Sequence, residues 1–158
     1  MRERFPTRPQ RSTWPARFRL QAMSDPDCLF CKIVAGDVPA TIVAEDERTV
    51  AFMDINPANP GHMLVIPRSH AKDLLGIDPE DLAAVARQGK VLAQRAVDVL
   101  GADGVNLLNS CGADAWQTVF HLHLHVIPRY KGDPLRLPWD PKPGDMADIA
   151  SIGERLAV

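Results

Sequence analysis

Three histidines at alternate positions, His121, His123 and His125, are the residues whose type and spacing best suit chemistry in this chain. The residues between them are aliphatic, and strict alternation of this kind predicts a half-buried strand. The aliphatic side chains would face the core, and the imidazoles would line up on the opposite face about 6.5–7 Å apart. Packing gives no reason for three imidazoles on one face, so the pattern favours a functional site over a chance polar strand at an interface.

Two chemistries use such a row of imidazoles. Neutral imidazole is a common ligand of transition metals. Alternatively, one histidine acts as a nucleophile while its neighbours hold its tautomer and contact the charge of the substrate. A second pattern is the Cys28-x2-Cys31 pair, whose spacing suits half of a zinc site. Cys111 lies far away in sequence, and three cysteines do not predict a disulfide framework.

The elements that position these residues follow from hydrophobic period and from turn residues. Five strands are expected, at 41–45, 48–53, 62–67, 104–109 and across the histidine segment 120–128. A helix is expected from Pro79 to Leu100, with Asp78 as its N-cap and Gly101 as its C-terminal stop. Gly89 in its interior predicts a close approach to the sheet, and 25–32 is expected to be a turn-rich entry. The order predicts an α+β fold with an antiparallel sheet.

Composition indicates one globular domain. The 158 residues are 46% apolar and 24% charged, and no apolar run is long enough to cross a bilayer. The net charge of −2 argues against nucleic-acid binding. Residues 1–22 hold six arginines and one glutamate, and are expected to be a disordered basic extension upstream of a natural start at Met23. Residues 23–158 are expected to form the domain, with a proline-rich tail from about 129. No targeting signal is evident, so a cytoplasmic protein is expected.

Several motifs together carry a family resemblance. His121 to Ile127, H-L-H-L-H-V-I, resembles the signature of the histidine triad family of nucleotide hydrolases and transferases. Four further segments agree in order and spacing: C-L-F-C-K-I-V at 28–34, F-M-D-I-N-P at 52–57, P-G-H-M-L-V-I-P at 60–67 and Q-T-V at 117–119. The resemblance implies a five-stranded antiparallel sheet with one long helix and short helices. It also implies a homodimer whose sheets join into one of ten strands.

The resemblance also implies a reaction and the residues that perform it. His123 would attack the α-phosphorus of a purine nucleoside phosphoramidate and form a nucleotidyl-histidine, which water resolves to an AMP-like product. His121 and His125 would flank the nucleophile, and His62 would complete the network. No cofactor is implied for catalysis. The remaining implied contacts are with phosphate at Asn109, Gln117 and Thr118, with the ribose at Asp54, and with the base at Phe30, Ile33 and Ile55.

Alternatives stay open at this stage. The three apolar residues of the base pocket could equally be core, and His62 could be a structural histidine. Zinc-bearing family members resemble a Cys2His2 set of Cys28, Cys31, His70 and His121, which would make a structural zinc site. The substrate could instead be a dinucleoside polyphosphate. The triad itself could hold a catalytic metal, or the chain could be a nucleotide-binding partner protein. Trp116 replaces the usual small residue before Gln117, which bears on the leaving-group pocket.

Overall fold

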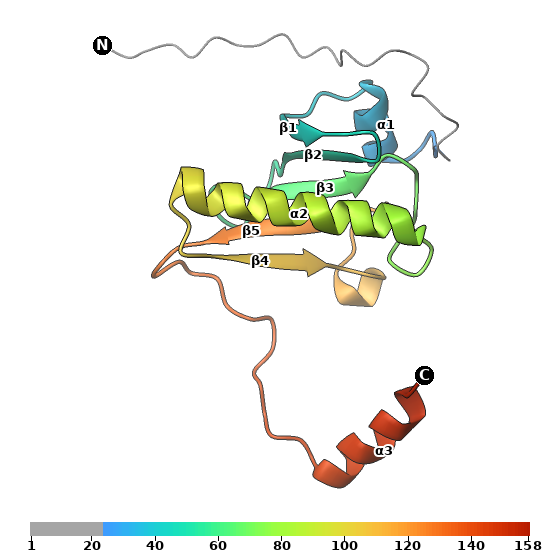
Figure 1. Cartoon of the computed structure of the whole chain (residues 1–158), viewed down its shortest axis with the longest axis vertical. Helices are drawn as coiled ribbons and strands as arrows, with labels where there is room; N and C mark the ends of the chain where they lie inside the picture. The colour runs from blue at the N-terminus through green and yellow to red at the C-terminus, as the bar shows by residue number, and fades with distance from the viewer. Residues whose placement is uncertain (1–23) are drawn as a thin grey trace.

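The computed structural model describes residues 24–158, so the predicted basic extension and Met23 lie outside the described residues. One antiparallel sheet carries the fold, in the strand order β1-β2-β3-β5-β4. Its strands are β1 (Ile42–Glu45), β2 (Thr49–Met53), β3 (Met63–Pro67), β4 (Gly104–Asn109) and β5 (Leu124–Arg129). The predicted five-stranded antiparallel α+β fold is confirmed, and Figure 1 shows the long helix α2 lying across one face of the sheet.

Helix α2 (Pro79–Leu100) has the bounds that its capping residues predict. The Asp78 carboxylate accepts hydrogen bonds from the backbone N–H groups of Glu80 and Asp81, at 2.9 and 3.3 Å. Gly101 ends the helix in the left-handed conformation, at φ 67°. A Cβ atom added at Gly89 would lie 2.7 Å from Leu124 Cδ2, which confirms the predicted close approach of this glycine to the sheet.

Two sequence predictions of local structure are wrong. The expected turn-rich entry contains a helix, α1 (Leu29–Ala35), which ends at Gly36 in the left-handed conformation. The fifth strand begins at Leu124, so His121 and His123 precede it instead of lying within it. The alternation of faces extends beyond the regular strand. Leu122 packs in the cluster under α2, whereas His121 and His123 contact Phe30 of α1 on the other side. Periodicity therefore predicted the faces correctly and the strand boundary incorrectly.

Both faces of the sheet are covered, and this decides where the histidines lie. The face under α2 packs Val65, Val126 and Leu122 against Val85 and Leu92 of the helix. The opposite face packs against α1, in a second cluster of buried residues: Cys28, Phe30, Cys31, Val50, Phe52, Leu64 and Ile66. The histidine row belongs to the α1 side, since His125 is paired with Leu64 across the strands. The imidazoles are therefore partly enclosed.

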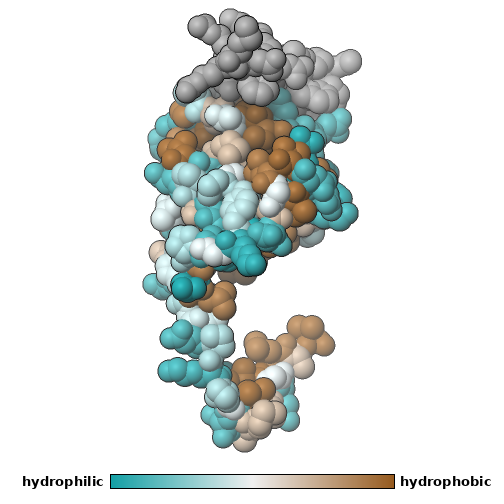
Figure 2. Space-filling view, turned by 90° about the vertical axis from the view of Figure 1, so that its left-hand side faces the viewer, coloured by the Kyte–Doolittle hydropathy of each residue, from teal (hydrophilic) through white to brown (hydrophobic). Residues whose placement is uncertain are grey.

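The proline-rich tail leaves the sheet after β5 and ends in helix α3 (Met146–Leu156). Asp145 caps α3 by accepting from the N–H groups of the next turn. The apolar side chains of α3 stay exposed, and Figure 2 shows them as a brown surface on the projecting tail. Within residues 24–158, no helix combines the length and apolarity needed to cross a membrane.

Candidate active site and metal centre

His123 is held in one tautomer by the main chain. Its Nδ1–H donates to the carbonyl oxygen of His121 at 2.7 Å, which leaves the lone pair on Nε2. The side chain is 4% exposed, and the ring of Phe30 meets it edge-on with 5.4 Å between ring centroids. The amide of Asn109 in turn donates to the His123 carbonyl at 2.9 Å. A neutral imidazole with one defined nitrogen free is the form in which histidine acts as a nucleophile.

His125 lies beside His123 and is held by His62. The two rings of His123 and His125 are 4.9 Å apart between centroids, and His62 Nε2 lies 2.9 Å from His125 Nδ1. The backbone N–H of Ala58 donates to His62 Nδ1 at 3.1 Å, so that nitrogen is unprotonated and the proton of His62 is on Nε2. His62 therefore donates to His125 Nδ1, and the proton of His125 is on Nε2. This is a suitable position for a donor to a substrate oxygen or leaving group.

Burial keeps the flanking histidines neutral in the ligand-free protein. The pKa of His125 is lowered to about 4, first by burial and then by repulsion from His123 and His62. Burial also lowers the pKa of His62, and the carboxylate of Asp54, 3.5 Å from His62 Nδ1, opposes this shift. A phosphate bound next to His125 would raise its pKa, because an anion favours the protonated ring.

The predicted nucleoside-binding residues lie in different environments. Phe30 is 5% exposed and contacts the rings of His121 and His123, so it is at once core and a wall of the site. Ile55 is 88% exposed, and Ile33 packs at the edge of the α1 core cluster. The Asp54 carboxylate accepts a hydrogen bond from the backbone N–H of Asn56 at 2.8 Å. Asp54 begins the connection between β2 and β3, and His62 ends it.

The phosphate-binding residues predicted after β4 divide in the same way. Thr118 is exposed, whereas Gln117 is 4% exposed and its amide is fully used by the main chain. Gln117 accepts from Gly112 N–H at 2.8 Å and donates to the carbonyls of Lys72 and Val119 at 2.7 and 3.1 Å. Its observed contribution is thus to hold the loop after β4 against the segment around Lys72. A contact with phosphate stays a prediction, and it would require these bonds to exchange.

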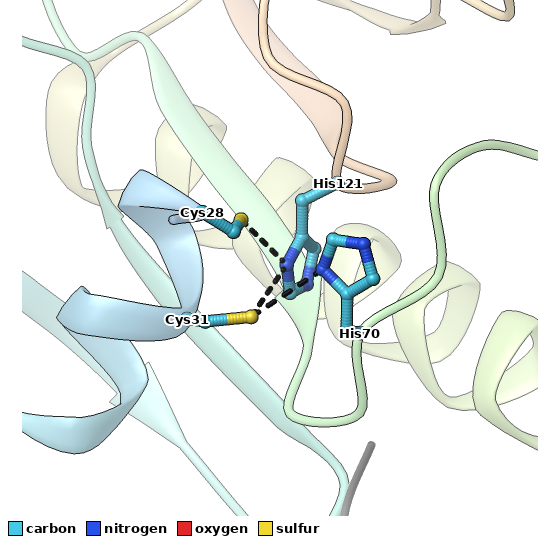
Figure 3. Close-up of side chains that lie close together, drawn as sticks. All are labelled: Cys28, Cys31, His70 and His121. Carbon is cyan, nitrogen blue, oxygen red and sulfur yellow. Dashed lines mark hydrogen bonds between the residues drawn. The ribbon is translucent and has the colours of Figure 1, made fainter. Parts of the chain in front are cut away.

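Four side chains that the sequence predicts as metal ligands lie together between α1 and the histidine segment (Figure 3): Cys28, Cys31, His70 and His121. His121 Nδ1 lies 3.5 Å from Cys28 Sγ and 3.6 Å from Cys31 Sγ, and His70 Nδ1 lies 3.4 Å from Cys31 Sγ. All four ligand atoms are within 4.8 Å of one another. Ligand atoms around a tetrahedral zinc lie about 3.3–3.8 Å apart, given its bond lengths.

The protonation of these groups fits a metal. His121 is fully buried and its Nε2–H donates to the Pro67 carbonyl at 2.9 Å, which leaves Nδ1 free towards both sulfur atoms. Burial lowers the pKa of His121 to about 4, so the ring is neutral as a ligand requires. Burial also raises the pKa of the Cys31 thiol, and a bound cation would offset that cost. The donor set therefore fits zinc.

Sequence reasoning missed the groups that orient the histidines. The carbonyls of His121 and Pro67 and the N–H of Ala58 are backbone atoms, which no residue pattern can reveal. It also missed Asn59 and Asp133, which are joined by a 2.8 Å hydrogen bond behind the His62 turn. A turn-rich connection and an acidic residue in a tail gave no signal that they would meet.

Comparison with known proteins agrees with this geometry. Residues 35–132 match the family model of the HIT domain. "Protein hit" of Bacillus subtilis is 41% identical over 138 residues, covering 83% of this chain and 95% of the relative. "Adenylylsulfatase HINT3" of Arabidopsis thaliana is 38% identical over 107 residues, covering 68% of this chain and 54% of the relative.

A solved structure bears on the cysteines as well as on the fold. The zinc-bound histidine triad family protein of Mycobacterium smegmatis superposes with a TM-score of 0.68 at 46% identity, covering 73% of this chain and 84% of that one. A zinc ion in so similar a protein agrees with the Cys2His2 cluster found next to the triad. With the family match, the relatives and the row of imidazoles in agreement, the chain belongs to the HIT, or histidine triad, family.

Proposed function

We propose that this protein is a nucleotide hydrolase that cleaves purine nucleoside phosphoramidates at the α-phosphate. The observation that carries the proposal is the 2.7 Å hydrogen bond from His123 Nδ1–H to the His121 carbonyl. It leaves Nε2 as the one basic nitrogen of a neutral ring, next to a second histidine whose own Nε2 carries a proton. A nucleophile beside a proton donor is what displacement of a poor leaving group needs.

The reaction has two balanced steps. When the substrate phosphate binds, His125 takes up a proton and becomes the imidazolium. Nε2 of His123 then forms a bond to the α-phosphorus as the bond from phosphorus to the leaving amine breaks, and the amine takes a proton from Nε2–H of His125, whose ring becomes neutral. A water molecule then attacks phosphorus and breaks the phosphorus–nitrogen bond to His123. That water returns a proton to His125, so AMP is released and both rings regain their starting state. His62, whose Nε2 lies 2.9 Å from His125 Nδ1, holds the His125 ring so that its Nε2 faces the leaving group.

Two other leaving groups are compatible with the same steps. Dinucleoside polyphosphates would release a nucleotide, and the Arabidopsis relative is named an adenylylsulfatase, which points to sulfate as a leaving group for that protein. All three substrate types share the adenylyl group. Their leaving groups differ in basicity, and therefore in whether they must be protonated as they depart. Trp116, a residue 58% exposed in the middle of the loop after β4, is a candidate to choose among them.

The first experiment measures AMP release from adenosine 5′-monophosphoramidate and from a diadenosine polyphosphate. We expect His123→Ala to lose at least about a thousandfold in turnover, because the nucleophile is removed. Gln94→Ala, on the exposed side of α2, should match the wild type and serves as the control. Activity that survives in His123→Ala would contradict the proposal. If a chelator abolishes AMP release while the protein stays folded, a metal-based hydrolysis is favoured. If the protein binds AMP tightly but turns over neither substrate, a nucleotide-binding protein is favoured.

We also infer that Cys28, Cys31, His70 and His121 hold a structural zinc ion. A closed set of four protein ligands leaves no position for a substrate, so the ion would stabilise the fold and take no part in the chemistry. A further proposal is that two chains form a homodimer whose sheets join into one, as the family resemblance implies, and we propose the free edge of β4 as the joint. The proposed substrate is a purine nucleotide, and we propose the cytoplasm as the location.

A further inference from the structure

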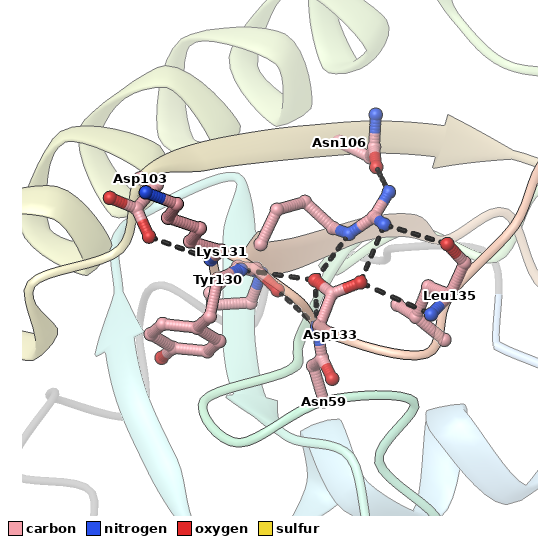
Figure 4. A network of polar contacts seen from close by, with 9 residues as sticks. Asn59, Asp103, Asn106, Tyr130, Lys131, Asp133 and Leu135 are labelled. Atoms are coloured by element: carbon pink, nitrogen blue, oxygen red, sulfur yellow. Dashed lines mark hydrogen bonds and ion pairs between the residues drawn. The ribbon is translucent and has the colours of Figure 1, made fainter.

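A carboxylate at the start of the tail, Asp133, gathers hydrogen bonds from three segments of the chain (Figure 4). Arg129 donates to it through Nε and a terminal nitrogen, at 2.8 and 2.7 Å, and Asn59 Nδ2 donates at 2.8 Å. The backbone N–H groups of Tyr130 and Leu135 add two more, at 3.0 and 3.1 Å. The Asp133 side chain is 6% exposed. Its lone pairs are therefore used by the protein itself, which indicates a positioning role rather than a ligand site.

The same segment clamps the turn that precedes β3. Asn59 Nδ2 donates to the Pro128 carbonyl at 2.9 Å as well as to Asp133, and Tyr130 Oη donates to the Pro60 carbonyl at 3.0 Å. Asn59 is 6% exposed and its own carbonyl accepts from His62 N–H at 3.1 Å. The turn at 58–62 is thus fixed from behind by residues 128–133.

These contacts form a closed series that includes His62 and His125, the two histidines proposed to handle the proton. The turn presents Ala58 N–H to His62 Nδ1, and His62 donates to His125. His125 lies on β5, and β5 runs directly into residues 128–133, which hold the turn. A shift of the turn therefore changes the Ala58–His62 bond, and with it the nitrogen of His125 that carries the proton.

We propose that Asp133 is a positioning residue for the reaction, and that it acts by holding the 58–62 turn so that His125 presents Nε2–H to the leaving group. This inference rests on the proposed function. Asp133 lies one residue beyond the stretch that matches the HIT domain, 35–132. The competing explanation is that the Arg129–Asp133 pair only anchors the tail, in which case its loss would lower stability without affecting proton transfer.

The experiment compares two substrates whose leaving groups differ in their need for a proton. Adenosine 5′-monophosphoramidate releases an amine, which must be protonated, whereas the p-nitrophenyl ester of AMP releases a stabilised phenolate. For Asp133→Asn and for Asn59→Ala we expect kcat on the phosphoramidate to fall about tenfold to a hundredfold, part of the range for general acid catalysis, with KM little changed. On the nitrophenyl ester both variants should keep wild-type kcat. His125→Ala should show the same selectivity to a larger degree.

Asp81→Asn is the matched control, because Asp81 also pairs with an arginine, Arg48, at 2.6 Å but does not touch the turn. This variant should keep wild-type kcat on both substrates. An equal loss on both substrates, or no loss on either, would overturn the proposal. Two variants on separate segments keep the test decisive if one of them folds poorly.

Ring nitrogen spectra separate this inference from the proposed function. Two-bond 15N–1H correlations should show His125 protonated on Nε2 in the wild type and as a mixture of tautomers in Asp133→Asn. If the wild type hydrolyses neither substrate, the proposed function fails and the spectra alone decide the inference. Unchanged tautomers of His62 and His125 in both Asp133→Asn and Asn59→Ala would refute it.

Discussion

The carbonyl of His121 determines which nitrogen of His123 is free, and the Nε2–H of His62 determines the same for His125. Imidazole is useful here because its two nitrogens can be assigned separately. His121 differs from the other two, since one nitrogen donates to Pro67 and the other faces two thiols. Three identical residues therefore have three different environments, and each is set by the hydrogen-bond partners of its ring nitrogens.

A prediction at this scale concerns acid stability. The ordinary pKa of a histidine is 6.5 and that of His125 is lowered to about 4, so the unfolded chain takes up this proton more readily than the folded one. The free energy of unfolding should be highest above pH 6.5 and fall as the pH drops towards 4. Melting temperatures recorded from pH 7 to pH 4 should decline less steeply for His125→Gln than for the wild type. Parallel curves would show that burial of His125 does not contribute.

At the scale of elements, α1 depends on its surroundings. A helix of seven residues is too short to be stable alone. With its N-cap residue it carries both cysteines of the cluster and Phe30, which contacts His123. Its N-cap residue, Cys28, provides no side-chain cap. Core packing and the proposed metal must therefore hold it on the sheet.

The metal prediction follows from this dependence. Purified protein should contain about one zinc per chain, and Cys31→Ser should lose most of it, because one of four ligands is replaced by a weaker one. Without the metal, amide exchange should become faster across residues 28–36 while α2 stays protected. Cys111→Ser is the matched control, since Cys111 lies outside the cluster and should leave zinc content unchanged. Equal zinc content in both variants would rule out the proposed ligand set.

Substitutions at two glycines with similar φ angles can test how tightly the turn before His62 is packed. Gly61 has φ 86°, and a Cβ there would lie 2.5 Å from Leu100 Cδ1 and 3.2 Å from Pro128 Cγ. Gly36 has φ 84° with nothing within 4 Å of such an atom. Gly36→Ala should cost about 1–2 kcal/mol, the penalty for the left-handed conformation. Gly61→Ala should cost about 1–3 kcal/mol more from overpacking, measured by urea unfolding. Equal losses would show that the turn can adjust.

At the scale of the whole molecule, strand β4 and helix α3 each expose apolar side chains among residues 24–158. Strand β4 is at the edge of the sheet, with Leu107 48% and Leu108 39% exposed. Helix α3 stands apart from the sheet with an apolar stripe facing solvent (Figures 1 and 2). An unpaired edge strand with aliphatic side chains is a site at which chains associate, and natural proteins rarely leave one free.

The corresponding prediction is that the protein sediments as a dimer. Replacing both edge leucines, Leu107→Lys with Leu108→Lys, should shift it towards the monomer, because two like charges would face each other at the joined edges. Val91→Lys places a lysine on the exposed side of α2, where Val91 is 52% accessible, and should leave the dimer intact. A wild-type protein that sediments as a monomer at micromolar concentration would contradict the proposed interface.

The sequence by itself determined the periodic features. Alternation placed His121, His123 and His125 on one face, and capping residues gave the ends of α2, because both depend on neighbours a few residues away. Resemblance also pointed to the four proposed metal ligands, and the structure brings their side chains together.

Only the tertiary structure decided the contacts that connect distant segments. Asn59 meets Asp133 from 74 residues away, and His121 meets Cys28 from 93. It also decided that the fifth strand starts at Leu124, because the backbone N–H of Leu122 donates to the carbonyl of Ala71, in the loop after β3, instead of to a neighbouring strand. The physical reason is that a histidine's proton position depends on the atoms around both ring nitrogens. Those atoms come from backbone and loops that only folding brings together.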